Sequence, residues 1–309
     1  MGMENLIKAP LFAGSNLDVY WPDIDYFIQK INNKEYVSQM RFQIEYWNMI
    51  RSAMRLMGYP GKEIPINLTV DKGFLDKLSR YMIKAFNKDV SVSHRRPWKF
   101  SREVFRTHLE AITTSKPEGL ILGVADRAIY YGDSTAPNGN KWQADLIKKL
   151  LPNGETPFVS TVWRKWAQSG EIQKFVDVIK NKPVVVVGPF YYKNLAHKIG
   201  LTNHRYIQID LMEACLHVNK TMQQMSATYS EMVREHGEVI FIMSGGSAGA
   251  YLSYKFHDKF KKAHMFELGR ALDVYFYYDK IRRQQPKWVF GEWMDSRPPI
   301  WIKEGKNVK

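Results

Sequence analysis

The sequence predicts an α/β protein with a Rossmann-like, mostly parallel sheet and helices on both faces. Apolar runs of strand length recur along the second half of the chain, and the clearest are residues 184–187 and 239–243. Between such runs lie helix-length segments whose apolar residues stand three or four positions apart. Because strands that alternate with helices usually pair in parallel, we expect both faces of the sheet to be covered.

The composition is that of a globular protein. The chain has 309 residues, of which 45% are hydrophobic and 14% aromatic. It has no window of about 18 apolar residues and no apolar signal segment at its start, so we expect no membrane association. Cys215 is its one cysteine, which excludes an internal disulfide and fits a reducing compartment. We therefore expect a cytoplasmic protein, in a host cytoplasm if it is viral.

The first part of the chain, residues 1–95, predicts a mainly helical N-terminal layer. Apolar residues show helical spacing over residues 24–31, 37–57 and 73–86. Pro60, Gly61 and Pro65 separate the last two of these segments. Residues 96–280 form the predicted α/β catalytic domain, and 281–309 a basic, aromatic C-terminal tail packed on it.

In the α/β domain the predicted elements alternate between strand and helix. Strands or extended segments are expected at residues 119–124, 157–162, 184–188, 206–209, 239–243 and 263–269. Helices are expected at residues 141–151, 169–180, 212–235 and 250–262. Because parallel sheets bind ligands at the carboxyl ends of their strands, residues at these ends are candidate site residues. They include Asp126, Gly188, Ser244 and Glu267.

The turn after residues 239–243 supports two different chemistries. Its small residues are Ser244, Gly245, Gly246, Ser247 and Gly249, and a helix follows them. Glycines let a backbone approach a ligand, and a helix N-terminus presents free N–H groups that attract phosphate. The same residues also form a Gly-x-Ser-x-Gly string, which is a nucleophile elbow in some hydrolases.

A serine hydrolase needs a histidine and a carboxylate near Ser247. His257 follows ten residues along the same helix, about 15 Å away, which is too far to be the partner. His264 with Glu267 or Asp273 is the remaining choice. The turn has neither a Walker A lysine nor a Gly-x-Gly-x-x-Gly fingerprint, so the motifs of ATPases and dehydrogenases are missing.

The charge of the chain favours an anionic partner. There are 45 Lys and Arg against 31 Asp and Glu, which gives a net charge of +14. Basic and aromatic residues also alternate over residues 91–106 and in the tail, a pattern that suits phosphate contact with base stacking. The candidate nucleic-acid-binding residues are Arg95, Arg96, Trp98, Lys99, Arg102, Arg282, Arg283 and Lys287. Alternatively, they form solvated faces and a strap on the core.

Several segments, taken in order, resemble the GT-D glycosyltransferases. The run from residue 239 to Lys255 resembles the strand, small-residue turn and helix of that family. Residues 263–275 resemble its following strand, which ends in an Asp-Ile-Gly-His motif with an aspartate nearby. Upstream, residues 120–126 resemble its Val-Gly-Ile-Pro-Asp strand. The resemblance covers roughly residues 105–280.

The resemblance implies transfer of a sugar from a nucleotide-diphosphate donor. Residues 244–249, with Gly188, would lie near the donor. Glu267, Gly269 and Arg270 would line the pocket, and Asp273 or Glu267 would be the catalytic base. One motif of the family is missing, because the chain has no Asp-Gly-Glu string before residue 110. Metal use and the catalytic carboxylate are therefore left open, with Asp126 as a further candidate and a divalent metal lacking a clear motif.

For the acceptor, the net charge and the resemblance together favour DNA. Glycosyltransferases of tailed bacteriophages modify hydroxymethylated bases in DNA, and this chain looks similar in kind. A transferase that acts on a glycan or a protein is the main rival hypothesis. Two further hypotheses are a serine hydrolase and a non-catalytic nucleic-acid-binding protein.

Overall fold

The computed structural model describes residues 6–8, 19–42, 44–59, 68–88, 101–124, 139–152, 155–160 and 162–284. Its strands are β1 (Leu6–Lys8), β2 (Tyr20–Pro22), β3 (Ser38–Phe42), β4 (Leu120–Val124), β5 (Phe158–Val159), β6 (Pro183–Gly188), β7 (Asn203–Gln208), β8 (Val239–Met243) and β9 (Ala263–Glu267). Its α-helices are α1 (Ile24–Asn32), α2 (Ile44–Leu56), α3 (Lys72–Lys88), α5 (Arg102–Thr113), α6 (Gly139–Leu150), α7 (Val162–Ser169), α8 (Ile172–Ile179), α9 (Leu195–Lys198), α10 (Val218–His236), α11 (Ser247–His257) and α12 (Lys280–Gln284). Two 3₁₀ helices follow strands, η3 (Phe190–Asn194) and η4 (Ala271–Phe276).

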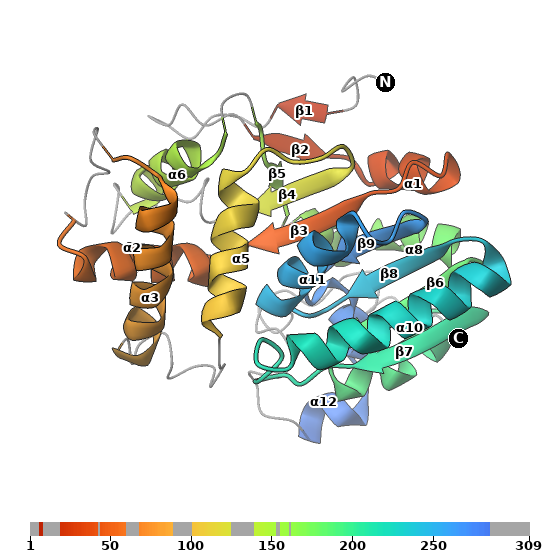
Figure 1. The fold of residues 1–309 in the computed structure, drawn as a ribbon. Coiled ribbons are helices and arrows are strands. Elements are labelled where there is room, and N and C mark those ends of the chain that lie inside the picture. The colour runs from red at the N-terminus through yellow and green to blue at the C-terminus, as the bar shows by residue number, and fades with distance from the viewer. Residues whose placement is uncertain are drawn as a thin grey trace.

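All of these strands belong to one sheet, in the order β1-β2-β5-β4-β3-β9-β8-β6-β7. Eight of them are parallel, and β1 pairs antiparallel with β2 at one edge. Helices α10 and α11 cover one face of the sheet, and α8 lies on the other (Figure 1). The predicted fold class, a mostly parallel sheet with helices on both faces, is confirmed.

The two faces of the sheet bury alternate residues of the central strands. In β8, Ile240 and Ile242 join a core with α7 and α8, whereas Phe241 and Met243 join a second core with α10 and α11. Successive side chains of a strand point to opposite faces, so a strand covered on both sides needs an uninterrupted apolar run. This is why residues 239–243 are recognisable in the sequence.

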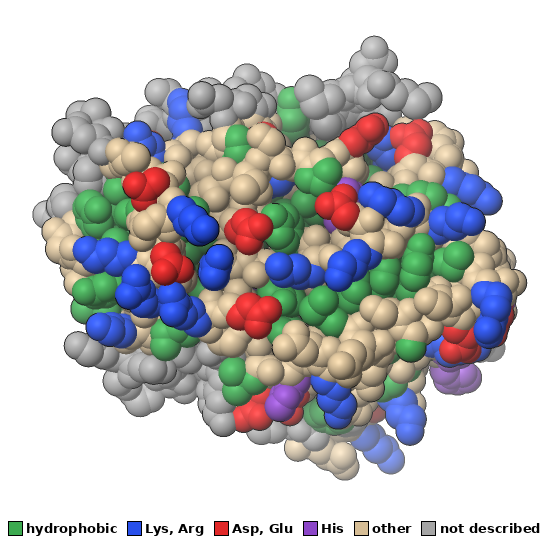
Figure 2. Space-filling model, viewed as in Figure 1, with side chains coloured by type: hydrophobic (Ala, Val, Ile, Leu, Met, Phe, Trp, Pro, Cys, Tyr) green, Lys and Arg blue, Asp and Glu red, His purple; other side chains and the backbone are tan. Residues whose placement is uncertain are grey.

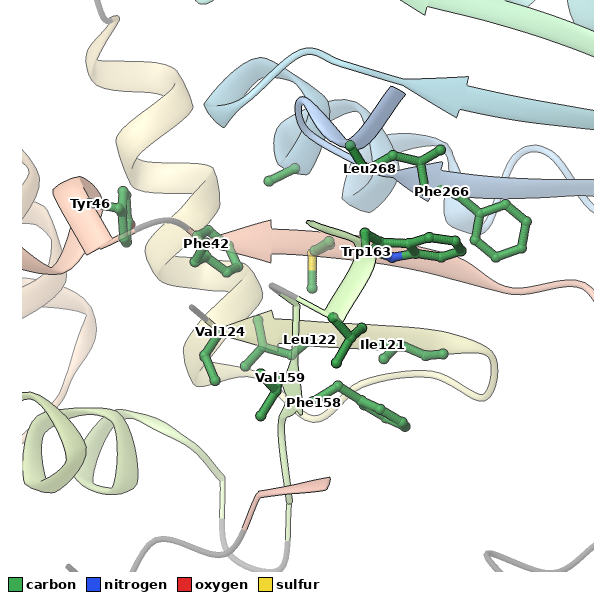
Figure 3. Close-up of a cluster of buried hydrophobic side chains, with 14 of the residues drawn as sticks. Phe42, Tyr46, Ile121, Leu122, Val124, Phe158, Val159, Trp163, Phe266 and Leu268 are labelled. Carbon is green, nitrogen blue, oxygen red and sulfur yellow. The ribbon is translucent and has the colours of Figure 1, made fainter. Parts of the chain in front are cut away.

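An aromatic cluster fills the core between the sheet and α7. The ring of Trp163 lies 5.1 Å from that of Phe27, 5.0 Å from that of Phe175 and 5.9 Å from that of Phe266. Figure 3 shows Trp163 and Phe266 side by side in this cluster. Its members come from α1, α7, α8 and β9, so the cluster joins the two ends of the chain.

The prediction of a single helical segment over residues 37–57 is wrong at its start. Residues 38–42 form β3, which lies in the middle of the sheet between β4 and β9. Its sequence hides it, because Ser38, Gln39 and Arg41 interrupt the apolar run although each is buried. The N-terminal residues therefore supply a central strand as well as a helical layer.

The helical layer lies beyond the carboxyl ends of the strands. Helix α2 packs against α3, and α3 packs against α5 (Figure 1). The helices predicted over 24–31 and 73–86 are confirmed as α1 and α3. Helix α5 is capped by Ser101, whose hydroxyl accepts a hydrogen bond from the N–H of Val104 at 3.2 Å. None of the described helices combines the length and apolar character that a membrane crossing requires.

Three boundaries differ from the prediction. The helix expected over 169–180 is α8 and begins only at Ile172, because Gly170 has a φ of 89° that a helix cannot contain, and the preceding helix α7 was not predicted. The strand expected over 206–209 starts earlier, as β7. The helix expected over 212–235 starts only at Val218 and ends before Gly237, a left-handed C-cap. Residues 285–309, most of the predicted tail, lie outside the described residues.

The aromatic cluster gives a stability prediction. Because Phe266 is fully buried there, Phe266→Ala should lower the free energy of unfolding by about 3–5 kcal/mol. Leu216→Ala is the control, since Leu216 is 43% exposed and its loss should cost less than about 0.5 kcal/mol. Urea denaturation measures both. Equal effects of the two substitutions would contradict the packing of this cluster.

Candidate active site

The candidate site lies where the carboxyl ends of β3, β6, β8 and β9 meet. In a parallel sheet these ends share one edge, and the loops that follow them form the ligand site. Here β8 is followed by the turn into α11, β6 by η3 and β9 by η4. The strands point toward the side of the molecule where α2, α3 and α5 lie (Figure 1).

The carboxylate of Glu267 lies at the centre of this edge. Glu267 is the last residue of β9 and is fully buried. Its Oε2 accepts a hydrogen bond from the N–H of Gly245 at 3.1 Å, and its Oε1 accepts one from the N–H of Gly269 at 3.0 Å. The N–H of Gly246 also stabilises the charged carboxylate. The side chain thus connects the turn before α11 with the loop after β9.

Two glycines are required by this arrangement. A Cβ at Gly249 would lie 1.7 Å from the Oε2 of Glu267. A Cβ at Gly269 would lie 1.4 Å from the Nη1 of Arg41, and the φ of Gly269 is +57°. Gly249, one of the turn glycines predicted to approach a ligand, thus lies against the side chain of Glu267.

Arg41 is the charged residue that acts on Glu267. It lies in β3 and is only 5% exposed. Burial raises the pKa of Glu267 to about 7, although the Arg41 guanidinium and the glycine N–H groups favour the charged form. A carboxyl group with a pKa near neutrality is suited to accept or donate a proton at physiological pH.

Asp273, predicted as a base, is held in a second buried cluster. Its Oδ1 accepts hydrogen bonds from the hydroxyls of Tyr192 at 2.9 Å and Tyr191 at 3.3 Å. Both tyrosines belong to η3, and the hydroxyl of Tyr192 also interacts with Ser244. Asp273 is fully buried, and these hydrogen bonds join η4 to η3.

Ser247 has no histidine in the position of a hydrolytic partner among the described residues. The Nε2 of His108, on α5, lies 2.8 Å from the backbone O of Ser247 and not beside its hydroxyl. Burial lowers the pKa of His108 to about 3, so the ring is neutral and Nε2 donates to that carbonyl. The Nε2 of His257 lies 2.9 Å from the O of Glu118, and the Nδ1 of His264 accepts the N–H of Val37 at 3.4 Å. Neither arrangement supports the nucleophile elbow.

The other predicted donor contacts border these two clusters. A Cβ at Gly188 would lie 2.6 Å from the ring of Tyr192, so this glycine too serves internal packing. Gly245 and Gly246 direct their N–H groups at Glu267. Ser244, Ser247 and Arg270 are half-buried and so reach the surface of this edge.

Part of the predicted nucleic-acid-binding set lies outside the described residues, as does Asp126. The members concerned are Arg95, Arg96, Trp98, Lys99 and Lys287.

The described members have contacts within the protein or are exposed. Arg102 lies 3.2 Å from Asp76, and Arg282 lies over the ring of Tyr277 at 4.4 Å and donates to its carbonyl. Arg283 is exposed.

The described residues do not show a metal site. Within the described part of the chain, no three His, Cys, Asp or Glu side chains come together as metal binding requires. Glu267 accepts from backbone N–H groups and Asp273 from tyrosine hydroxyls. We therefore assign no metal ligands.

Arg41, His108, Tyr191 and Tyr192 are site residues that the sequence reasoning missed. Arg41 lies in a strand whose sequence favours helix, and His108 lies in a helix that was not predicted. Tyr191 and Tyr192 follow directly after the clearest apolar run, residues 184–187, and this position was an available signal. Arg41 gave no local signal, because Glu267 lies near the other end of the chain.

Comparisons with known proteins identify the fold. No protein-family profile and no curated protein matches the chain. A solved structure described as a new glycosyltransferase (DUF1792) from Streptococcus sanguinis is 13% identical, with a TM-score of 0.52, and the match covers 84% of each chain. The selenomethionine-substituted structure of domain of unknown function 1792 is 10% identical, with a TM-score of 0.51, and the match covers 82% of this chain and 78% of that one. A further structure, of the same domain with "a distinct glycosyltransferase fold", is 11% identical with a TM-score of 0.47 and the same coverage.

The chain thus has the fold of the DUF1792 domain. At these identities the likeness establishes the architecture, and the chemistry has to be inferred from the site.

The Asp273 cluster gives a prediction at the site. Tyr192→Phe removes the shorter of two hydrogen bonds to a buried carboxylate, so it should lower the free energy of unfolding by about 1–3 kcal/mol. Tyr278→Phe is the matched control, because Tyr278 is 54% exposed and its change should stay within about 0.5 kcal/mol. Thermal and urea denaturation measure both variants. A Tyr192→Phe variant as stable as the control would show that the bond contributes nothing.

Proposed function

We propose that the protein is a glycosyltransferase that moves a sugar from a nucleotide-diphosphate donor to a hydroxyl group. The observation that carries the proposal is the meeting of three groups at one edge of the sheet. These are the carboxyl group of Glu267 with its pKa near 7, the guanidinium of Arg41 and the N-terminus of α11. The fold shared with a structure described as a glycosyltransferase supports the same class.

Glycosyl transfer has two chemical requirements that groups at this edge can meet. The leaving diphosphate must be neutralised, and the acceptor hydroxyl must be oriented or deprotonated. We assign the first to Ser244 and Ser247, where the chain enters α11, and to Arg270 at the start of η4, all of which are half-buried. Glu267 contributes to the second indirectly, because its fully buried carboxylate holds the turn that carries Ser244 and Ser247. Asp273 is likewise buried and accepts hydrogen bonds from two tyrosine hydroxyls.

For the acceptor, we propose a hydroxymethylated base in DNA. The support is the net charge of +14 and the distribution of cations near the site. Lys77, Arg80 and Lys84 of α3 and Arg106 of α5 are exposed. Lys and Arg side chains gather over this part of the molecule in Figure 2, although Asp and Glu lie among them. A glycan or protein acceptor is the rival, which these charges favour less.

A transfer assay tests the proposal directly. DNA that contains hydroxymethylcytosine is incubated with the protein and a panel of nucleotide sugars, and the bases are then analysed by mass spectrometry. We expect a mass gain of one pentose or hexose on the modified base and none on unmodified DNA. Release of nucleotide without any gain on DNA would point to another acceptor. No release, transfer or binding with any donor would overturn the glycosyltransferase proposal.

Donor binding should depend on Arg270. If its guanidinium contacts the diphosphate, Arg270→Ala should weaken the affinity for the donor by about 10- to 100-fold, the usual effect of losing a charged hydrogen bond. Arg283→Ala is the matched control, because Arg283 is an exposed arginine on α12. Isothermal titration calorimetry with the active donor compares the two. Equal affinities would remove Arg270 from the donor site.

A further inference from the structure

Glu267 joins several separate segments of the site through one side chain. Through Gly245 and Gly246 it holds the turn before α11, and through Gly269 the loop after β9. Its charge acts on Arg41, whose guanidinium packs against Gly269. The N-terminus of α11 is an anion-binding position, and here the anion is a side chain of the same chain.

The close approach at Gly249 shows how tightly the carboxylate is held. Gly249 lies in the first turn of α11, and a Cβ on this residue would meet the Glu267 carboxylate first, at 1.7 Å. The helix can therefore occupy this position against β9 only while residue 249 has no side chain. Any shift of the carboxylate also changes the turn that carries Ser244 and Ser247.

We propose that Glu267 is a positioning residue whose carboxylate fixes the first turn of α11 and the Arg41 guanidinium relative to each other. The consequence for donor binding rests on the proposed function, whereas the structural role does not. In this role Glu267 presents the half-buried Ser244 and Ser247 to the donor without contacting it. The glycines of the turn then serve Glu267 and not the diphosphate.

Titration of Glu267 would loosen this arrangement. Its pKa of about 7 lies above that of the nearby histidine and below those of the nearby tyrosines, so Glu267 titrates separately from them. The pKa of His108, which faces α11 from α5, is about 3, and burial raises the pKa values of Tyr191 and Tyr192 on η3 above 10. Arg41 stays charged, and Asp273 on η4 is held by the two tyrosines. Above pH 7 the ionised carboxylate accepts from the glycine N–H groups and is stabilised by the charge of Arg41, and below pH 7 it becomes protonated and neutral.

A double-mutant cycle tests the geometry without any assay of activity. With Glu267 present, Gly249→Ala places a methyl group where the carboxylate lies, so the folding equilibrium constant should fall at least tenfold. In an E267A background that space is vacant and alanine is the better helix former, so G249A should raise the constant by up to about fivefold. This reversal of sign supports the proposal. The same effect of G249A in both backgrounds would overturn it.

Amide chemical shifts test the titration. In the wild type, the amide signals of Gly245 and Gly269 should move with pH around a midpoint near 7, and Glu267→Gln should abolish this movement. Asp258→Asn is the control, because the side chain of Asp258 is 74% exposed and away from the turn. Signals that do not respond to pH, or that respond equally in E267Q, would overturn the proposal.

Kinetics separate a positioning role from stability alone. With an active donor, kcat/KM of the wild type should fall about tenfold per pH unit below pH 7. The E267Q variant should have low activity without this dependence, and the Asp258→Asn variant should keep it. A wild-type acid limb in E267Q would overturn the role. Absence of transfer with every donor would count against the proposed function and leave the cycle and the amide titration as independent tests.

Discussion

The burial of one carboxylate sets the arrangement of the carboxyl edge of this sheet. A buried charge is costly unless hydrogen bonds and an opposite charge replace the lost water. For Glu267 the replacement comes from glycine N–H groups on two loops and from Arg41 on a third segment. These groups are contributed by β3, the turn before α11 and the loop after β9. The positions of three segments are therefore coupled through a single side chain.

The same interaction changes the meaning of the glycine-rich turn. In the sequence, residues 244–249 fit a phosphate-binding turn and a nucleophile elbow equally well, because both need glycines at a strand-to-helix junction. In the structure, Gly249 and Gly269 make room for Glu267 and Arg41. The imidazole of His108 contacts the backbone carbonyl of Ser247 and not its hydroxyl. The glycine-rich motif thus indicates that another group packs closely against the turn, but it does not identify that group.

The sequence predicts the features that depend on local patterns and misses those that depend on contacts between distant residues. The strands at 184–187 and 239–243 were identifiable because burial on both faces requires continuous apolar residues. Strand β3 was not, since it buries polar residues whose contacts are with residues far away in the sequence. The indole N–H of Trp163 donates to Gln39 at 2.7 Å, and Glu267 lies near Arg41. Glu267 and the turn glycines were predicted at the site, but their mutual contact joins residues far apart in sequence and needed the fold.

The placement of the helical layer bears on which acceptors can approach. Helix α5 contacts the start of α11 twice, through His108 and through Glu103, which accepts the hydroxyl of Tyr251 at 2.8 Å. Helix α3, which carries exposed cations, packs against α5, which in turn contacts α11. An anionic acceptor gains attraction from these side chains on its approach, whereas a neutral glycan gains none. Because such attraction between exposed charges is screened by salt, its contribution to the approach of an anionic acceptor falls as the salt concentration rises.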